Sequence, residues 1–160
     1  MEERFYHCNA CGNLAFIALA SGITPHCCGK EMTLLKPNTS DGNTEKHLPV
    51  VECIKEGMIK VKVGTVPHPM TKEHNIRLIC LETDTEFVIH YLEETQKPEV
   101  CICFTGKPKA VYSYCNIHGL WRTDVPSSCS TMKKSSSMDK ATCNTEKHPD
   151  ASCKSQNYCG

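Results

Sequence analysis

The residues with the clearest chemical potential are thirteen cysteines and eight histidines in a chain of 160 residues. Near the N-terminus, the CxxC pair Cys8 and Cys11 is followed, after fifteen residues, by the adjacent Cys27 and Cys28. Four thiolates suit a tetrahedral Zn or Fe ion, and their spacing alone leaves both metals open. Because neighbouring side chains tend to diverge, one ion held by both Cys27 and Cys28 requires a bent backbone there.

A second set of donors is spread over the middle of the chain in the motifs EKH, HPMTKEH and CNIH. Most of these residues stand near Pro or Gly, as residues in loops and at strand ends do. Loops at one end of a β-sandwich can converge on an ion. One histidine alone is more often a surface or core residue than a ligand, but the combination predicts a metal site. Its five donors, one fewer than octahedral iron needs, are His47, His68, His74, Cys115 and His118.

The pentapeptide NTEKH occurs twice, at residues 43–47 and 144–148. The first copy attaches Glu45 and Lys46 to the candidate ligand His47. A neighbouring charged pair is usually a solvated surface feature, and only its attachment to a ligand favours a role in chemistry. The second copy lies in a segment with too few apolar residues to build a site around it. We interpret that copy as a repeat of the motif without a functional site around it.

Strand signals are repeated between residues 44 and 125, where runs such as IRLICLE and KAVYSYC are rich in β-branched and aromatic residues. We predict six or seven short strands and an all-β sandwich in this region. A small metal domain is predicted at 1–36 and a linker at 37–43. Residues 126–160 contain no Val, Ile, Leu, Phe or Trp, so we predict a Ser/Lys/Cys-rich tail that is disordered without a metal or cross-links.

Composition limits the partners and the compartment. The net charge is zero and the pI is about 7.0, which gives no global field for nucleic acid or a membrane surface. The sequence shows neither a run long enough to span a membrane nor a secretory signal, so we predict a cytoplasmic protein. Its cysteines should then be thiols or metal ligands, not a disulfide framework.

The cysteines outside the two candidate metal sites fall into two sets. Those in strand-like runs are predicted to behave as small buried hydrophobic residues; they are Cys53, Cys80, Cys101 and Cys103. The tail cysteines form no CxxC pair, and a third metal site there is the minor alternative to disorder. They are Cys129, Cys143, Cys153 and Cys159.

The motifs together resemble one known family. FYHCNACGN with HCCGKEM resembles the desulforedoxin-type N-terminal domain. TEKHLPV, VGTVPHPMTKEHNI and YCNIHGLW resemble the neelaredoxin-like catalytic domain of desulfoferrodoxins, the two-iron class of superoxide reductases. The match runs in order from residue 5 to about 122 and leaves the tail uncovered. It implies a small β domain with a four-cysteine iron centre, then an immunoglobulin-like β-sandwich with the active iron, usually in a homodimer.

The resemblance also implies a mechanism. Superoxide would be reduced by one electron to hydrogen peroxide at an iron with four equatorial histidines, axial Cys115 and one open position. Lys46 would attract superoxide, and Glu45 would close the open position by binding ferric iron. An external donor, expected to be rubredoxin, would return the iron to the ferrous state. The four-cysteine centre, where Zn can substitute, could relay electrons without being required for the chemistry.

Three other functions compete with this interpretation. A blue-copper electron carrier also uses His and Cys on a β-sandwich, but Leu120 and Trp121 stand where a Met ligand would follow His118. A zinc-stabilised binding protein would have no redox role. A superoxide dismutase would need no external reductant, and we favour the reductase because the iron is thiolate-ligated without ligands for a second metal.

Overall fold

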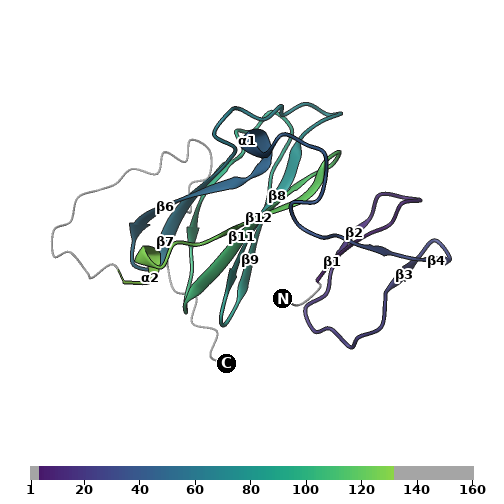
Figure 1. Cartoon of the computed structure of the whole chain (residues 1–160), viewed down its shortest axis with the longest axis horizontal. Coiled ribbons are helices and arrows are strands. Elements are labelled where there is room, and N and C mark those ends of the chain that lie inside the picture. The colour runs from purple at the N-terminus through teal and green to yellow at the C-terminus, as the bar shows by residue number, and fades with distance from the viewer. Residues whose placement is uncertain (1–3, 132–160) are drawn as a thin grey trace, which may run out of the picture.

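The computed structural model describes residues 4–131, and all of its strand pairs are antiparallel (Figure 1). The chain begins with a small module of short strands. Three of them form a sheet in the order β2–β1–β5, and two more form a separate hairpin. The strands are β1 (Phe5–His7), β2 (Leu14–Phe16), β3 (His26–Cys27), β4 (Lys30–Glu31) and β5 (Thr33–Leu34).

The module is followed by a seven-stranded sandwich, which confirms the predicted all-β fold. A short helix, α1 (Thr44–His47), precedes it. One sheet has the order β10–β7–β6, with β6 (Pro49–Lys55), β7 (Met58–Val63) and β10 (Glu99–Cys103). The other has the order β12–β11–β8–β9, with β8 (Ile76–Thr83), β9 (Phe87–Tyr91), β11 (Pro108–Cys115) and β12 (Gly119–Asp124). Among the described residues, no helix has the length and hydrophobicity that a membrane span needs.

The hydrophobic pattern of each strand follows from the number of faces that it buries. In β7, Ile59, Val61 and Val63 face the core between the sheets and alternate with lysines, as in a strand with one solvated face. The runs in β8 and β11 are nearly continuous because their sheet is covered on both faces. Ile79 and Leu81 of β8 lie in the core between the sheets.

The outer face of the four-stranded sheet is covered by the N-terminal module, which lies beside it in Figure 1. Phe5 contacts Tyr112 with ring centroids 5.5 Å apart, and Phe16 contacts Phe87 at 5.0 Å. The guanidinium of Arg4 lies over the Phe87 ring at 5.0 Å. Buried aromatic contacts of this kind stabilise by about 0.5–1.5 kcal/mol each beyond the area that they bury, so they attach the module to the sandwich.

The connector between module and sandwich follows the edge strand β12. The side-chain amide of Asn38 donates to the Arg122 carbonyl at 3.0 Å and accepts from the Arg122 N–H at 2.8 Å. The Ser40 hydroxyl donates to the carbonyl of His118 at 2.5 Å. The predicted domain boundaries, at 1–36, 37–43, 44–125 and 126–160, remain predictions. The hydrogen bonds of Asn38 and Ser40 fasten this connector to Arg122 and His118.

The chain continues beyond β12 into a second short helix, α2 (Ser128–Thr131). Cys129 forms a disulfide with Cys53 of β6, with their Cα atoms 5.1 Å apart. A cross-link that closes a loop of this size stabilises a fold by roughly 4 kcal/mol in the chain-entropy account. The rest of the tail that was predicted to be disordered, residues 132–160, lies outside the described residues. The second NTEKH copy and Cys143, Cys153 and Cys159 belong to this part of the chain.

The disulfide corrects the prediction that the cysteines would all be thiols or metal ligands. Cys53 is half-buried and oxidised, not a free hydrophobic residue, and Cys101 and Cys103 are disulfide-bonded as well. Strand periodicity cannot reveal a partner 76 residues away, because the pairing depends on where the chain returns after β12. Only Cys80 of this set is the buried free thiol that was predicted.

The loop after β7 holds α1 against the end of the sandwich. Gly64 N–H donates to the Leu48 carbonyl at 2.9 Å, and the N–H of Thr65 donates to the Glu45 carbonyl at 2.8 Å. Gly64 has φ of +78°, and a Cβ atom there would lie 2.7 Å from the Lys46 carbonyl oxygen. Both the left-handed conformation and this close approach require glycine.

We expect Gly64→Ala to lower the free energy of unfolding by about 2–4 kcal/mol, since it adds a steric clash to an unfavourable φ. Gly22→Ala is the matched control, because Gly22 has φ of +81° and a Cβ atom added there would have no other atom within 4 Å. It should cost only about 1–2 kcal/mol. Urea unfolding monitored by circular dichroism measures both changes, and equal losses would contradict the steric role of Gly64.

Candidate metal centres

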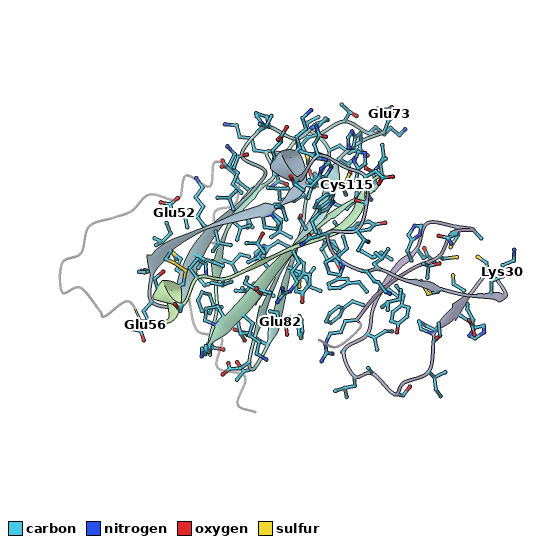
Figure 2. The ribbon with its side chains drawn as sticks, viewed as in Figure 1. Lys30, Glu52, Glu56, Glu73, Glu82 and Cys115 are labelled. Atoms are coloured by element: carbon cyan, nitrogen blue, oxygen red, sulfur yellow. A yellow bond between two sulfur atoms is a disulfide. The ribbon has the colours of Figure 1, made fainter. Side chains whose placement is uncertain are left out.

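The second predicted set of donors comes together at one end of the sandwich. His47 ends α1, and His68 and His74 lie in the loop between β7 and β8. Cys115 ends β11, and His118 lies in the turn to β12. The potential ligand atoms of all five residues lie within 4.8 Å of one another. Figure 2 shows Cys115 at the end of the sandwich nearest α1.

The four imidazole rings form a closed cycle. The centroid distances between neighbours are 4.6 Å for His47 and His68, 4.6 Å for His68 and His74, 4.9 Å for His74 and His118, and 4.6 Å for His118 and His47. The rings of His47 and His74, on opposite sides of the cycle, are 6.3 Å apart. The Cys115 sulfur lies 3.6 Å from His118 Nδ1. This is an arrangement of four nitrogen donors around a centre, with one buried sulfur beside them.

The hydrogen bonds of the rings indicate which nitrogen atoms are available to a metal. His47 Nδ1 donates to the Asn43 carbonyl at 2.7 Å, and His68 Nδ1 donates to the Pro69 carbonyl at 2.5 Å. In the neutral rings, each Nε2 atom therefore carries no proton and has a lone pair available to a metal. The two Nε2 atoms lie 3.0 Å apart. His74 Nε2 is buried without a hydrogen-bond partner. Lone pairs that face each other in this way fit a shared cation, with the carbonyls orienting the ligand rings.

Burial keeps these imidazoles uncharged. It lowers the pKa of His68 to about 4, against the opposing effect of the Pro69 carbonyl. Desolvation is also the main cause that lowers the pKa of His47 and of His74. A neutral imidazole is the form that binds a metal, so the fold presents these three rings ready for coordination near neutral pH.

The predicted ligand Cys115 is completely buried. Burial raises the pKa of its thiol, while the backbone N–H groups of His118 and Ile117 act in the opposite direction. Next to it, the Asn116 side chain accepts from the Asn75 N–H at 2.9 Å and donates to the Glu73 carbonyl at 2.8 Å. This amide fastens the loop that carries His74 to the strand that carries Cys115.

Two residues that support the cluster were not identified from the sequence. The Trp121 ring stacks on His47, with centroids 4.9 Å apart and planes at 17°, and its Nε1–H donates to the His118 carbonyl at 3.0 Å. The Ser113 hydroxyl donates to the His47 carbonyl at 2.8 Å. A usable signal existed for both: Ser113 shares a strand face with Cys115, and Trp121 follows His118 by three residues.

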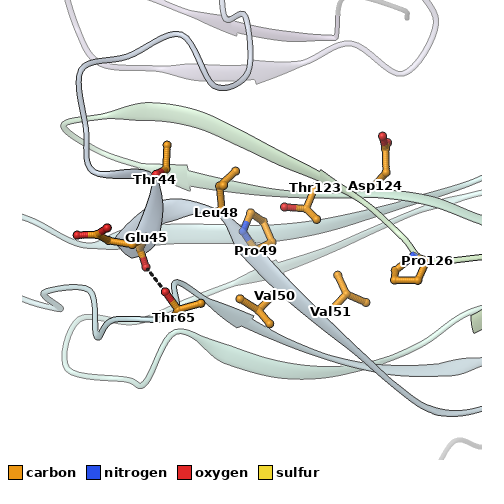
Figure 3. A pocket seen from close by; sticks show the side chains of 10 residues that line it. All are labelled: Thr44, Glu45, Leu48, Pro49, Val50, Val51, Thr65, Thr123, Asp124 and Pro126. Atoms are coloured by element: carbon orange, nitrogen blue, oxygen red, sulfur yellow. Dashed lines mark hydrogen bonds between the residues drawn. The ribbon is translucent and has the colours of Figure 1, made fainter.

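Glu45 and Lys46 lie on α1 immediately before His47, but their side chains have different surroundings. Lys46 is half-buried, and after desolvation and the neighbouring imidazoles, its charge contributes to the lowered pKa of His47 and His74. Its ammonium group therefore acts on the cluster electrostatically. Glu45 is exposed, and Figure 3 shows its carboxylate pointing away from the other residues drawn there.

A groove of about 400 Å³ runs beside α1, and none of the five clustered donors lines it. Its lining includes apolar side chains of β6 and the polar Thr123 and Asp124 at the end of β12 (Figure 3). The lining residues are Thr44, Glu45, Leu48, Pro49, Val50, Val51, Thr65, Thr123, Asp124 and Pro126. The groove is separate from the donors that could bind a metal.

The first predicted set of donors also comes together, within the N-terminal module. The ligand atoms of Cys8, Cys11, Cys27 and Cys28 lie within 4.8 Å of one another. Cys28 and Gly29 have φ of +53° and +73° and form the two-residue turn between β3 and β4, as a type I′ hairpin requires. This turn is the bent backbone that the adjacent cysteines were predicted to need, and it brings both sulfurs to one side.

The four thiols influence one another strongly. Backbone N–H groups of Cys11 and Ala10 lower the pKa of Cys8 to about 7, whereas hydrogen bonds with Cys11 and Cys27 raise the pKa of Cys28 to about 12. The sulfurs of Cys11 and Cys27 are 3.6 Å apart. Four thiolates at such distances repel one another unless a cation is shared, and four sulfur donors suit iron or zinc.

The comparisons with known proteins point to one family. The family model for desulfoferrodoxin matches residues 39–124. A desulfoferrodoxin of Syntrophotalea carbinolica is 41% identical over 119 residues, which cover 74% of this chain and 94% of that protein. A desulfoferrodoxin of Nitratidesulfovibrio vulgaris is 40% identical over 123 residues, covering 77% of this chain and 97% of that protein.

A solved structure agrees with these sequence relatives. The crystal structure of the superoxide reductase from Treponema pallidum is 33% identical with a TM-score of 0.63, and the match covers 77% of this chain and 99% of that one. About a quarter of the present chain thus lies outside each match. The resemblance seen in the sequence motifs is confirmed, and the chain belongs to the desulfoferrodoxin family.

Proposed function

We propose that the chain is a superoxide reductase, which converts superoxide to hydrogen peroxide at one iron ion. The observation that carries this proposal is the closed cycle of four imidazoles with the buried Cys115 thiol beside it. Four neutral nitrogens and one thiolate suit a redox-active transition metal. Membership of the desulfoferrodoxin family and the likeness to a superoxide reductase support iron as that metal.

The proposed reaction takes one electron and two protons for each superoxide. Iron bound by the five donors would supply the electron, with the thiolate of Cys115 donating charge to it. The neutral imidazoles add no negative charge that would repel an anionic substrate. Their hydrogen bonds to the carbonyls of Asn43 and Pro69 hold the donor geometry constant during electron transfer. Protons come from solvent.

Lys46 is proposed to attract superoxide and to hold a proton-donating water near it. Its charge already acts on His47 and His74, and local positive charge of this kind steers a small anion even in a protein of zero net charge. Glu45, one residue away and exposed, is proposed as the carboxylate that binds the oxidised iron after product has left.

The four-cysteine group is proposed as a second iron centre, where zinc can substitute. Its sulfurs would complete the coordination of the ion, so its role would be electron relay or stabilisation of the module.

The electron donor is proposed to be a rubredoxin, and the assembly is proposed to be a homodimer. A cytoplasmic location is proposed as well.

Metal content separates this function from its alternatives. We expect two irons per chain in the wild type and about one in His68→Ala, with loss of the superoxide reaction, because the substitution removes a buried donor. A Cys8→Ser/Cys11→Ser double variant should also fall to about one iron but still oxidise when superoxide is added. Metal analysis and absorption spectroscopy measure both results. Zinc or copper in place of iron at the histidine cluster would indicate a binding protein or an electron carrier.

Lys46→Ala should slow the reaction with superoxide by about tenfold at low ionic strength and weaken its dependence on salt. Pulse radiolysis at several salt concentrations gives both quantities. Lys60→Ala is the matched control, because Lys60 forms an ion pair with Glu99 at 3.6 Å on the sheet β10–β7–β6. An equal effect of the two substitutions would argue against local steering by Lys46.

The lowered pKa of His47, His68 and His74 predicts a pH effect on the metal-free protein. Below pH 6.5 these three side chains take up protons in the unfolded chain but stay neutral in the folded protein. The free energy of unfolding should therefore be largest above pH 6.5 and should decrease as the pH falls toward 4. Urea midpoints of chelator-treated protein between these pH values measure this loss. His68→Gln should reduce the slope and exposed His26→Gln should not; a midpoint independent of pH would refute the assignment.

A further inference from the structure

The Cys53–Cys129 disulfide belongs to neither candidate metal centre. It connects β6 with α2, and Figure 2 shows a disulfide in yellow between Glu52 and Glu56, away from Cys115. Both of its residues take part in the core between the sheets: Cys129 is 2% exposed, and Cys53 is a half-buried residue packed against that core. The bond therefore closes the end of the sandwich opposite to the imidazole cluster.

The bond joins the family fold to a segment outside it. Cys53 lies within the matched residues 39–124, whereas Cys129 lies beyond them. Three of the matched proteins leave about a quarter of this chain uncovered. The cross-link thus ties the part of the chain that the family model matches to the segment that follows β12.

Cys101 and Cys103 are disulfide-bonded too, but the remaining described cysteines differ from Cys53 and Cys129. The sulfurs of both metal groups are free thiols, and so is Cys80, whose pKa is raised to about 12 by burial. Such a thiol is inert because the thiolate is the reactive form. Cys53 is accessible from one side and has the Ser128 hydroxyl 3.8 Å from its sulfur. Cys129 is buried, and its Cα atom lies 5.1 Å from the Cα atom of Cys53.

This asymmetry suits a bond that opens and closes. A small dithiol can attack the accessible sulfur of Cys53, which releases the thiol of Cys129 inside the protein. Because α2 is held by packing against β6, the released sulfur stays next to its partner. Closure then needs only an oxidant that can reach Cys53.

We propose that Cys53 and Cys129 form a reversible redox latch, closed by hydrogen peroxide, which fastens the segment after β12 to β6. The thiolate of Cys53 attacks peroxide, the O–O bond breaks, and a sulfenic acid and water are formed. The Cys129 thiol then attacks that sulfur, the S–S bond forms, and a second water leaves. Two thiols lose two electrons and two protons, and peroxide becomes two waters. The peroxide source rests on the proposed function, since peroxide is its product.

The first experiment tests the latch without superoxide. Full-length, iron-loaded protein is reduced with a dithiol, freed of reductant, treated with one equivalent of added hydrogen peroxide, alkylated and mapped by mass spectrometry without reduction. We expect a peptide pair joined through Cys53 and Cys129, which disappears again with dithiol under native conditions. Alkylation of both cysteines after peroxide, or closure by diamide but not by peroxide, would overturn the proposal. So would a bond that the dithiol opens only after unfolding.

The second experiment measures what the latch does. Oxidised wild type should unfold at a temperature roughly 10 °C above the reduced protein. Because Cys101 and Cys103 are disulfide-bonded too, the comparison is made in a Cys101→Ser/Cys103→Ser background, where the difference should vanish to the same extent when Cys53→Ser, Cys129→Ser or both are added. The matched control is Cys101→Ser/Cys103→Ser, which alters the opposite edge strand of the same sheet and should keep the Cys53–Cys129 effect. A redox-dependent shift that survives in the Cys53 and Cys129 variants would assign it to other cysteines.

The two levels of the proposal can fail separately. If added peroxide closes the bond but the protein does not consume superoxide together with a reductant, the latch stands and the proposed reductase activity fails. If superoxide is reduced normally while added peroxide leaves Cys53 free, the reductase stands and the latch fails. Cys53→Ser should leave the reaction with superoxide unchanged, because β6 contributes none of the five donors.

Discussion

The cluster of four imidazoles and one thiol is the constraint around which the rest of the sandwich is arranged. Bare nitrogen lone pairs that face each other at 3.0 Å in a buried space are unfavourable unless a cation lies among them. The protein holds them there through backbone carbonyls, a stacked indole and a loop clamped by Gly64. The fold thus maintains an arrangement that only a bound metal makes favourable.

The four-stranded sheet connects this cluster to the N-terminal module. Cys115 ends a strand whose inner face lines the core and whose outer face carries Tyr112, in contact with Phe5. β8 and β11 are buried along most of their length, and a strand packed on both faces can hold a ligand in a fixed position. The same sheet therefore supports the imidazole cluster at one end and the four-cysteine module on its outer face.

Most of the fold and both donor sets could be predicted from the sequence, because their signals are local. Alternation in β7 and the motifs CNAC and CNIH need only a few consecutive residues to be recognised. The roles of Ser113 and Trp121 depend on which atoms meet across strands, and the oxidation of Cys53 depends on the path of the chain after β12. The Cys53–Cys129 pairing leaves no trace in periodicity, and a compartment argument about thiols gave the wrong state for Cys53.

The stacked indole has one more consequence. The chain contains one tryptophan, and its ring lies parallel to the ring of His47 at 4.9 Å. A paramagnetic or strongly absorbing ion beside that imidazole would be within range to quench the indole's excited state. The protein therefore carries an intrinsic fluorophore next to its imidazole cluster, so that metal loading can be followed in real time, without a label, through the emission of Trp121.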